Sequence, residues 1–163
     1  MASDECDHGQ PGSARRARGG HRHDGVLKRR ASLELVSPAG SWPAFKKAVD
    51  NGADAIYIGF RDETNARHFA GLNFDDKNAS KALNYARSKG KRVYLAINTY
   101  PQTARWSAWQ RAVDMAADLG VNAIIAADIG VLEYASQRHS TLHRHLSVQG
   151  SATNLGALTF YAE

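Results

Sequence analysis

Short, continuously apolar runs alternate with longer amphipathic stretches from Leu33 onward. Five runs have the length of strands, and their lack of polar alternation is typical of parallel strands covered on both faces. The pattern therefore predicts a parallel sheet. The expected strands are Leu33–Ser37, Ala55–Gly59, Val93–Asn98, Ala123–Asp128 and Leu146–Gln149.

Helical stretches follow each of these runs. Ser41 and Asp75 are suited to cap two of the helices, because short polar side chains accept hydrogen bonds from the first free backbone N–H groups. In a third stretch, apolar residues recur every three or four positions, which indicates one buried face. The helices are expected at Trp42–Asn51, from Asp75 to near Gly90, over Trp106–Gly120, at Ile129–Arg138 and from Asn154 onward.

Strand and helix thus alternate at about 30 residues per unit, which predicts right-handed crossovers between parallel strands. This α/β pattern fits either an open doubly wound sheet or a TIM-barrel-like (β/α) fold. No G-x-G-x-x-G motif follows the first strand, where the turn is Ser37-Pro38-Ala39-Gly40, so a dinucleotide-binding fold is disfavoured. About five βα units are present where a full barrel has eight, so a barrel formed by this chain would be incomplete.

Residues 1–31 differ in composition from the remainder. They contain no aromatic residue, five glycines and a cluster of arginines, and such a segment buries too little apolar surface to offset the entropy of ordering. We expect a disordered basic tail over 1–31 and the N-terminal part of a TIM-barrel-like domain over 32–163. The tail lacks the apolar core of a secretory signal, and the Arg29-Arg30-Ala31-Ser32 string suits a basophilic kinase.

Charge and cysteine content narrow the function classes. The net charge is +5, but residues 1–31 carry seven Lys/Arg against four Asp/Glu, which leaves only +2 on residues 32–163. Nucleic-acid binding by the folded part is therefore not expected. The single cysteine, Cys6, permits no internal disulfide, and no apolar run approaches a membrane span, so a cytoplasmic location without a membrane span is expected.

Polar residues gather where the predicted strands end, which is where α/β folds place functional groups. The loop from Phe60 to Phe74 is the longest, and long loops without structure of their own are usually functional. Within it, Arg67 is suited to hold a carboxylate or phosphate, and His68 to move a proton near neutral pH. The ligand-binding candidates are Asp62, Asn65, Arg67, His68, Asn98, Asp128 and Gln149.

Other groups are weaker candidates. Asp128 and Glu133 form a carboxylate pair, although Asp128 is equally suited to cap a helix. His143 and His145 are expected to precede a strand, at the opposite end of the sheet from the candidate loop. No nucleophile, catalytic triad or metal-ligand set is discernible, so the catalytic residues stay unassigned and no metal site is expected.

Several motifs resemble a known family, the collagenase-like peptidases of family U32. The most specific is the loop string from Asp62 to Phe74, T-N-A-R-H-F-A-G-L-N-F after Asp62-Glu63, and within the family it is most similar to members acting in ubiquinone biosynthesis. The Pro38-Ala39-Gly40 turn is shared more widely across the family. The resemblance extends from Leu33 to Glu163.

The resemblance implies a TIM-barrel-like domain and oxygen-independent hydroxylation of the ubiquinone ring. It further implies a UbiV-like partner subunit, a [4Fe–4S] cluster held by four cysteines in full-length members, and a small anionic hydroxyl donor such as prephenate. Cys6 alone cannot hold such a cluster. Three alternatives stay open: a collagenase-like peptidase, an RNA-hydroxylating relative, and an inactive fragment.

Overall fold

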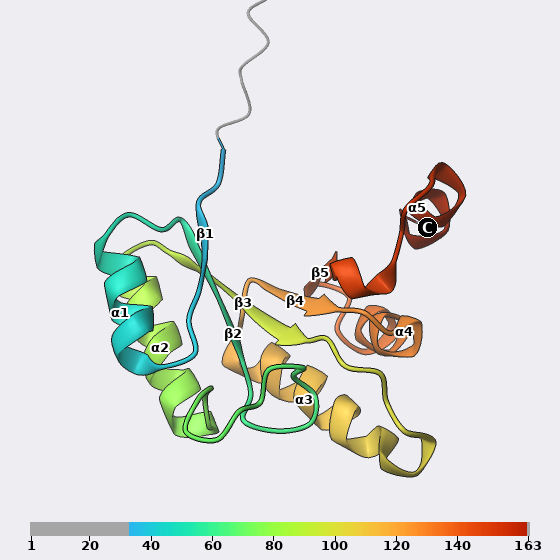
Figure 1. Cartoon of the computed structure of the whole chain (residues 1–163), viewed down its shortest axis with the longest axis horizontal. Coiled ribbons are helices and arrows are strands. Elements are labelled where there is room, and N and C mark those ends of the chain that lie inside the picture. Colours follow the sequence, from blue (N-terminus) through green and yellow to red (C-terminus); the bar gives the residue numbers. More distant parts are fainter. Residues whose placement is uncertain (1–32, 163) are drawn as a thin grey trace, which may run out of the picture. The chain divides into compact units, whose positions relative to one another are not determined.

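A five-stranded parallel sheet with helices in the crossovers forms the described part of the chain (Figure 1). The computed structural model describes residues 33–162, so the predicted tail and its kinase motif lie outside the described residues. The strands are β1 (Val36–Pro38), β2 (Ala55–Gly59), β3 (Arg92–Ile97), β4 (Ala123–Ala126) and β5 (His143–Leu146). The helices are α1 (Trp42–Asp50), α2 (Asp76–Ser88), α3 (Trp106–Leu119), α4 (Ile129–Arg138) and α5 (Leu155–Ala162), and the 3₁₀ turns are η1 (Thr103–Arg105) and η2 (Val148–Gly150).

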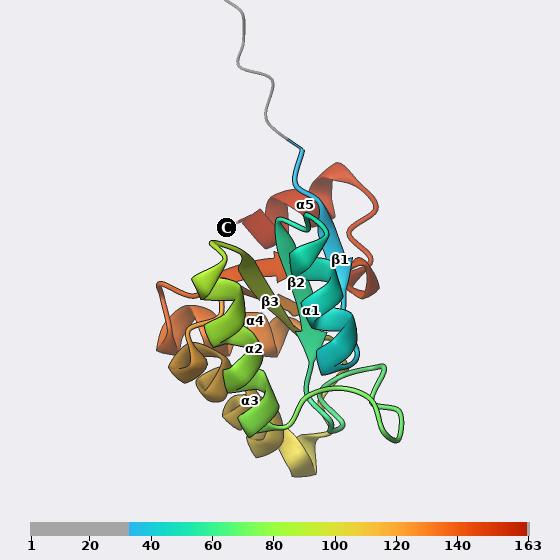
Figure 2. The same ribbon diagram turned by 90° about the vertical axis from the view of Figure 1, so that its left-hand side faces the viewer.

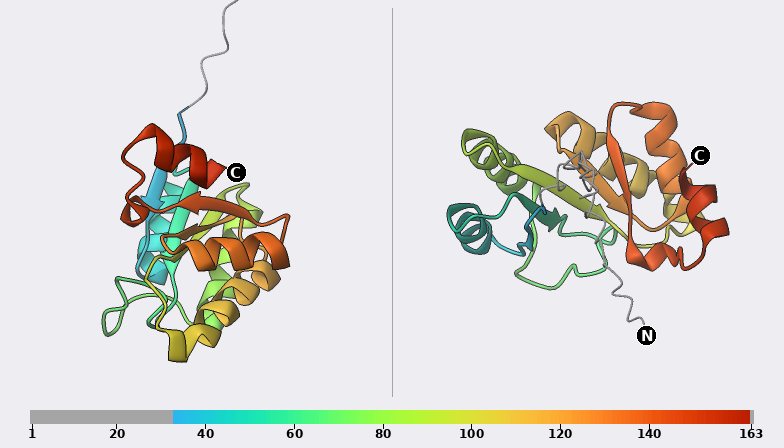
Figure 3. Two further views of the ribbon diagram at one scale, coloured as in Figure 1. Left: turned by 90° about the vertical axis from the view of Figure 1, so that its right-hand side faces the viewer. Right: turned by 90° about the horizontal axis from the view of Figure 1, so that it is seen from above.

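The strand order distinguishes between the two predicted architectures. The strands pair in the order β1-β2-β3-β4-β5, so each lies beside its neighbour in sequence. A doubly wound sheet reverses its order at a switch point, whereas a barrel adds strands consecutively. The α/β, TIM-barrel-like fold is therefore confirmed, and Figures 2 and 3 show helices α1 to α4 on one side of the sheet.

Successive residues along each strand point to opposite faces of the sheet. The helix-facing side supplies large aliphatic side chains such as Ile56, Leu95 and Ile124, which are 0% exposed and pack into the main core. Burying such a side chain contributes roughly 1.5–3 kcal/mol. The opposite face has a smaller cluster centred on Tyr94. The helix side therefore stabilises the fold, which leaves the other face for a site.

The predicted helix starts are confirmed by their capping bonds. The side chain of Ser41 accepts from the backbone N–H of Ala44 at 3.4 Å, and Asp75 accepts from Asn78 at 2.8 Å. Each bond satisfies a backbone donor that has no partner within its helix. Local side-chain chemistry therefore sets where these two helices begin.

Two strands differ from their predicted positions. The prediction for Leu146–Gln149 is wrong, because β5 is His143–Leu146, in register with β4, and the chain then turns into η2. The first strand begins at Val36 rather than Leu33, which is 97% exposed. Both are at the edges of the described sheet, where strands are incompletely covered and apolar content no longer marks them.

Helix α5 exposes an unusual amount of apolar surface. Leu155, Leu158 and Phe160 are 79%, 54% and 58% exposed, and none of the residues described for this helix is buried. Within residues 33–162, no helix has the length and apolar character required to cross a lipid bilayer. Contiguous exposed apolar residues favour association.

We therefore expect the isolated chain to self-associate. Replacing Leu155, Leu158 and Phe160 together by Gln removes most of this apolar surface and should yield a lower sedimentation coefficient at high protein concentration. The control is a triple replacement of exposed polar residues on α2. Sedimentation velocity over a concentration series measures the effect, and a wild-type chain that stays monomeric throughout would contradict the prediction.

Candidate functional site

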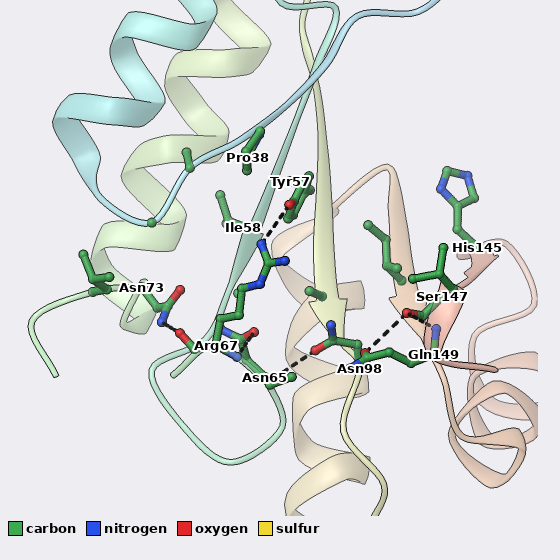
Figure 4. Close-up of a pocket in the computed structure, with 18 of the residues that line it drawn as sticks. Pro38, Tyr57, Ile58, Asn65, Arg67, Asn73, Asn98, His145, Ser147 and Gln149 are labelled. Atoms are coloured by element: carbon green, nitrogen blue, oxygen red, sulfur yellow. Dashed lines mark hydrogen bonds between the residues drawn. The ribbon is translucent and has the colours of Figure 1, made fainter. Parts of the chain in front are cut away.

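A cavity of about 620 Å³ opens at the carboxyl-terminal edge of the sheet. Its walls come from the ends of β1, β2, β3 and β5 and from the loop after β2 (Figure 4). The face of the sheet turned away from the helices is called the inner face. On it, β2 and β3 present Gly59 and Ala96 side by side. Because these residues have little or no side chain, the space above them is not filled. The cavity therefore follows from the sequence of the inner face.

The loop between β2 and α2 is fixed by its own side chains. Asp62 accepts hydrogen bonds from the backbone N–H and hydroxyl of Thr64, at 2.9 and 2.6 Å. The hydroxyl of Thr99, just after β3, donates to the carbonyl of Glu63 at 2.6 Å. Asp62 thus has an ordering function within the loop, and it does not line the cavity.

Asn65 anchors the centre of this loop against the end of β2. It is 4% exposed, its Nδ2 donates to the carbonyl of Phe60 at 3.2 Å, and its Oδ1 accepts from the backbone N–H of Arg67 at 3.1 Å. The amide packs directly on Gly59, where an added Cβ would lie 2.2 Å from Asn65 Nδ2. Glycine at position 59 therefore allows Asn65 to hold Arg67 in place.

The return half of the loop is held by two residues outside the predicted set. Arg61 donates from Nε to the carbonyl of Leu72 at 3.1 Å and from its guanidinium to that of Asn73 at 3.2 Å. Asn73 has a φ of 70°, and its Nδ2 donates to the carbonyl of Arg67 at 2.6 Å. Asn tolerates this left-handed conformation better than most residues. In the sequence, these two residues share only their positions near the two ends of the loop.

Arg67 directs its guanidinium along the inner face of β2 (Figure 4). Its one hydrogen bond from the guanidinium is a long one, 3.4 Å, to the hydroxyl of Tyr57. Within residues 33–162 no carboxylate forms a salt bridge with it, whereas Arg105 pairs with Glu63 and Arg92 with Glu34. Arg67 therefore brings an uncompensated positive charge to the cavity.

Amide side chains that follow β3 and β5 add further hydrogen-bond donors. The Oδ1 of Asn98 accepts from the backbone N–H of Ala66 at 3.0 Å. The Nδ2 of the same amide has no hydrogen-bond partner among residues 33–162. Gln149 lies in η2, where its backbone carbonyl accepts from the hydroxyl of Tyr100 at 2.6 Å. Ser147 caps this turn by accepting from the backbone N–H of Gln149 at 3.3 Å. Both amide side chains line the cavity.

The predicted candidates divide into two groups. Asn65, Arg67, Asn98 and Gln149 line one cavity, although they come from three separate segments. The others do not line it. The His68 ring is 2.8 Å from the carbonyl of Asn65, Asp62 orders the loop, and Asp128 caps α4 by accepting from Val131 N–H at 3.1 Å.

His145 lies elsewhere than predicted. It belongs to β5 rather than to the segment before a strand, and it lines the cavity with Arg67 instead of lying at the opposite end of the sheet. Its ring meets that of Tyr94 edge to face, with centroids 4.9 Å apart. The three-residue error in the position of β5 accounts for the difference. His143 is in the same strand but does not line the cavity.

Tyr94 is a buried residue of the inner face that holds a polar contact. Its hydroxyl donates to Glu34 at 2.6 Å, and Glu34 also pairs with Arg92 at 2.7 Å. Burial raises the pKa of the Tyr94 phenol, and the hydrogen bond to Glu34 raises it further. The phenol thus stays protonated as a donor to Glu34 beneath the cavity.

The residues of this chain do not fit an iron–sulfur cluster. A [4Fe–4S] cluster of the implied type needs four cysteine thiolates, and the chain has Cys6 alone, outside the described residues. Among residues 33–162 no group of three His, Cys, Asp or Glu side chains is arranged to hold a metal ion. We therefore derive no step through a cluster.

The fold and cavity define a (β/α)-barrel-type protein with a candidate ligand site at the carboxyl-terminal edge of its sheet. The model of peptidase family U32 matches residues 40–163, and the chain belongs to this family. The solved structure of a U32 peptidase superimposes with a TM-score of 0.64 at 14% identity, covering 85% of this chain and 58% of that one. This likeness supports the fold.

Curated relatives have differing names. The chain is 34% identical over 131 residues to an uncharacterized protease of Methanocaldococcus jannaschii and 31% identical over 130 residues to a collagenase of Porphyromonas gingivalis, covering 80% of this chain in both. It is 34% identical over 130 residues to tRNA hydroxylation protein P of Helicobacter pylori, covering 79% of this chain. In each case the match spans 31% of the relative's length.

Substituting Gly59 tests how the loop is anchored. In Gly59→Ala the new Cβ collides with the Asn65 amide, and overpacking of this kind costs about 1–3 kcal/mol. We expect hydrogen exchange of the amides in residues 60–74 to accelerate accordingly. Gly40→Ala is the control, because its Cβ would have Leu72 atoms no nearer than 3.9 Å. Equal exchange in both variants would contradict this account of Asn65.

Tyr94 predicts a dependence of stability on alkaline pH. The pKa of the Tyr94 phenol is raised in the folded state. The protonated phenol therefore contributes fully to the free energy of unfolding below the unfolded pKa of about 10, and this contribution is lost as pH rises through the folded pKa. Urea unfolding of a dilute sample should therefore show stability falling less steeply above that pH in Tyr94→Phe than in wild type. Tyr161→Phe, on α5, is the control, and identical slopes for wild type and Tyr94→Phe would contradict the assignment.

Proposed function

We propose that this chain forms the N-terminal part of a family U32 hydroxylase and that its cavity binds a small organic anion. One observation carries the proposal: Arg67 lines a mostly apolar cavity without a carboxylate partner within residues 33–162. A cation in such surroundings gains when an anion enters, because the interaction is stronger than in bulk water. The planar guanidinium is suited to bidentate binding of a carboxylate.

The remaining lining matches an organic acid rather than an inorganic ion. Apolar groups of Pro38, Leu72 and Ile125 share the cavity with the amides of Asn98 and Gln149. An apolar pocket with a few directed polar groups is the usual form of a small-molecule site. The ligand that fits is a compact hydrocarbon body with a carboxylate.

The more specific proposal is a UbiU-like role in oxygen-independent hydroxylation of the ubiquinone ring. Its support is the loop string from Asp62 to Phe74, which contributes Arg67 and five other residues to the cavity lining, together with relatives whose names refer to hydroxylation. Prephenate is then the expected anion and hydroxyl donor, a UbiV-like subunit the partner, and the cytoplasm the location. The cluster cysteines would have to be supplied by residues that this chain does not contain.

RNA hydroxylation is the second candidate. It is favoured by the names of relatives, including tRNA hydroxylation protein P of Helicobacter pylori and of Escherichia coli, the latter 28% identical over 130 residues. The charge balance favours it less, since residues 32–163 carry a net charge of only +2. A peptidase function has the collagenase relative in its favour, but it needs a nucleophile or metal that the described residues do not bring together. An inactive fragment is the outcome if no ligand binds.

Arg67→Gln tests the anion site. We expect wild-type chain to bind prephenate in isothermal titration calorimetry and the variant to bind it at least tenfold more weakly, because a charge-assisted pair contributes about 1.5–3 kcal/mol. Arg111→Gln, on α3 outside this cavity, is the matched control. Absence of prephenate binding by the wild type, or equal binding by wild type and Arg67→Gln, contradicts the proposed function.

Two further measurements separate the candidates. Association with a UbiV-like subunit that survives deletion of residues 1–31 would support the ubiquinone role. RNA binding that persists in the same deletion and weakens steeply with added salt would instead favour RNA hydroxylation, since phosphate contacts release counterions.

A further inference from the structure

The strand register places His145 across the cavity from Arg67. Gly59, Ala96, Ile125 and His145 are successive partners in β2, β3, β4 and β5, so they lie at one level of the inner face. Arg67 reaches the same region from the loop after β2 (Figure 4). The two side chains therefore flank a floor made mostly of small residues.

The width of this floor sets the size of a ligand. Three strand spacings separate β2 from β5, about 14 Å at the usual 4.7–4.9 Å per strand. The side chains of Arg67 and His145 occupy part of that width from either side. The remaining width between these two side chains suits a single six-membered ring with a substituent at each end, rather than a polymer or a fused-ring system.

The exposed imidazole of His145 has no hydrogen-bond partner among residues 33–162, and its ring packs against that of Tyr94 on β3. Tyr94 packs edge to face against it, and its hydroxyl is already directed to Glu34. Of the other three histidines among the described residues, His68 contacts the Asn65 carbonyl and His139 the carboxylate of Asp114 at 2.6 Å. His143 has no such partner, but it does not line the cavity. His145 is held in position while its ring nitrogens are left for a ligand.

We infer that His145 recognises the far end of the ligand that Arg67 holds, by donating a ring N–H hydrogen bond to an oxygen acceptor there. This inference rests on the proposed function, because it takes the anion at Arg67 as given. The ligand class is therefore a monocyclic acid with an oxygen acceptor opposite its carboxylate. His145 determines specificity for that second group.

Two acids matched in size test this role. The probes are trans-cyclohexane-1,4-dicarboxylate and trans-4-methylcyclohexanecarboxylate, titrated into the full chain by calorimetry at fixed ionic strength. We expect the diacid to bind wild type about tenfold more tightly, which corresponds to one charge-assisted hydrogen bond. In His145→Phe the preference should fall to about twofold, the statistical factor for two equivalent carboxylates, because the diacid loses its second partner while Phe preserves the aromatic contact with Tyr94.

Two variants control for structural effects. His145→Gln keeps an N–H donor and should retain part of the preference for the diacid, and His143→Phe, two residues earlier on β5 and outside the cavity lining, should retain all of it. If His145→Phe keeps the full preference while Arg67→Gln weakens both acids, the His145 role is overturned and the anion site stands. If neither acid binds wild type, the anion site fails and the inference fails with it.

Discussion

The closure of the β2–α2 loop onto the end of β2 is the constraint on which the site depends. Phe60 and Phe74 form a parallel bridge, with Phe74 N–H donating to the Gly59 carbonyl and Arg61 N–H to that of Phe74, both at 3.1 Å. Backbone bonds that fix both ends of a loop lower its conformational entropy, and the side-chain bonds of Asn65 and Asn73 to the backbone of Arg67 position its middle. Arg67, midway along, is thereby restricted to the mouth of the cavity.

The two faces of the sheet divide stability and function between them. Side chains such as Ile58 and Leu95 point to the helices and are fully buried, whereas the alternate residues Gly59 and Ala96 leave room on the inner face. A single alternation along each strand thus produces both the core and the cavity. Substituting an inner-face residue is expected to alter binding more than folding, except at Gly59, where the Asn65 amide is packed on the backbone.

Much of the fold could be predicted from the sequence, but only part of the site. Central strands such as Ala55–Gly59 were predictable because nearly all of their residues are buried and apolar, and the helix starts at Ser41 and Asp75 because capping is local. The β5 strand was not, since an edge strand of composition His-Arg-His-Leu has no apolar signature. His145 was misplaced for the same reason. Arg61 and Asn73 were missed because their roles are hydrogen bonds to backbone carbonyls, which leave no compositional trace.

The chain therefore has the side chains of the proposed recognition site, whereas its single cysteine cannot supply the four thiolates of an iron–sulfur cluster. Arg67, Asn98 and His145 belong to three different βα segments, and the parallel register together with the closed β2–α2 loop brings them to one edge. Each has a bond or packing contact that orients it and donor atoms not used by the described fold. The proposed recognition can thus be tested separately from cluster chemistry, because the side chains that would carry it come from the sheet, the loop after β2 and the segment after β3.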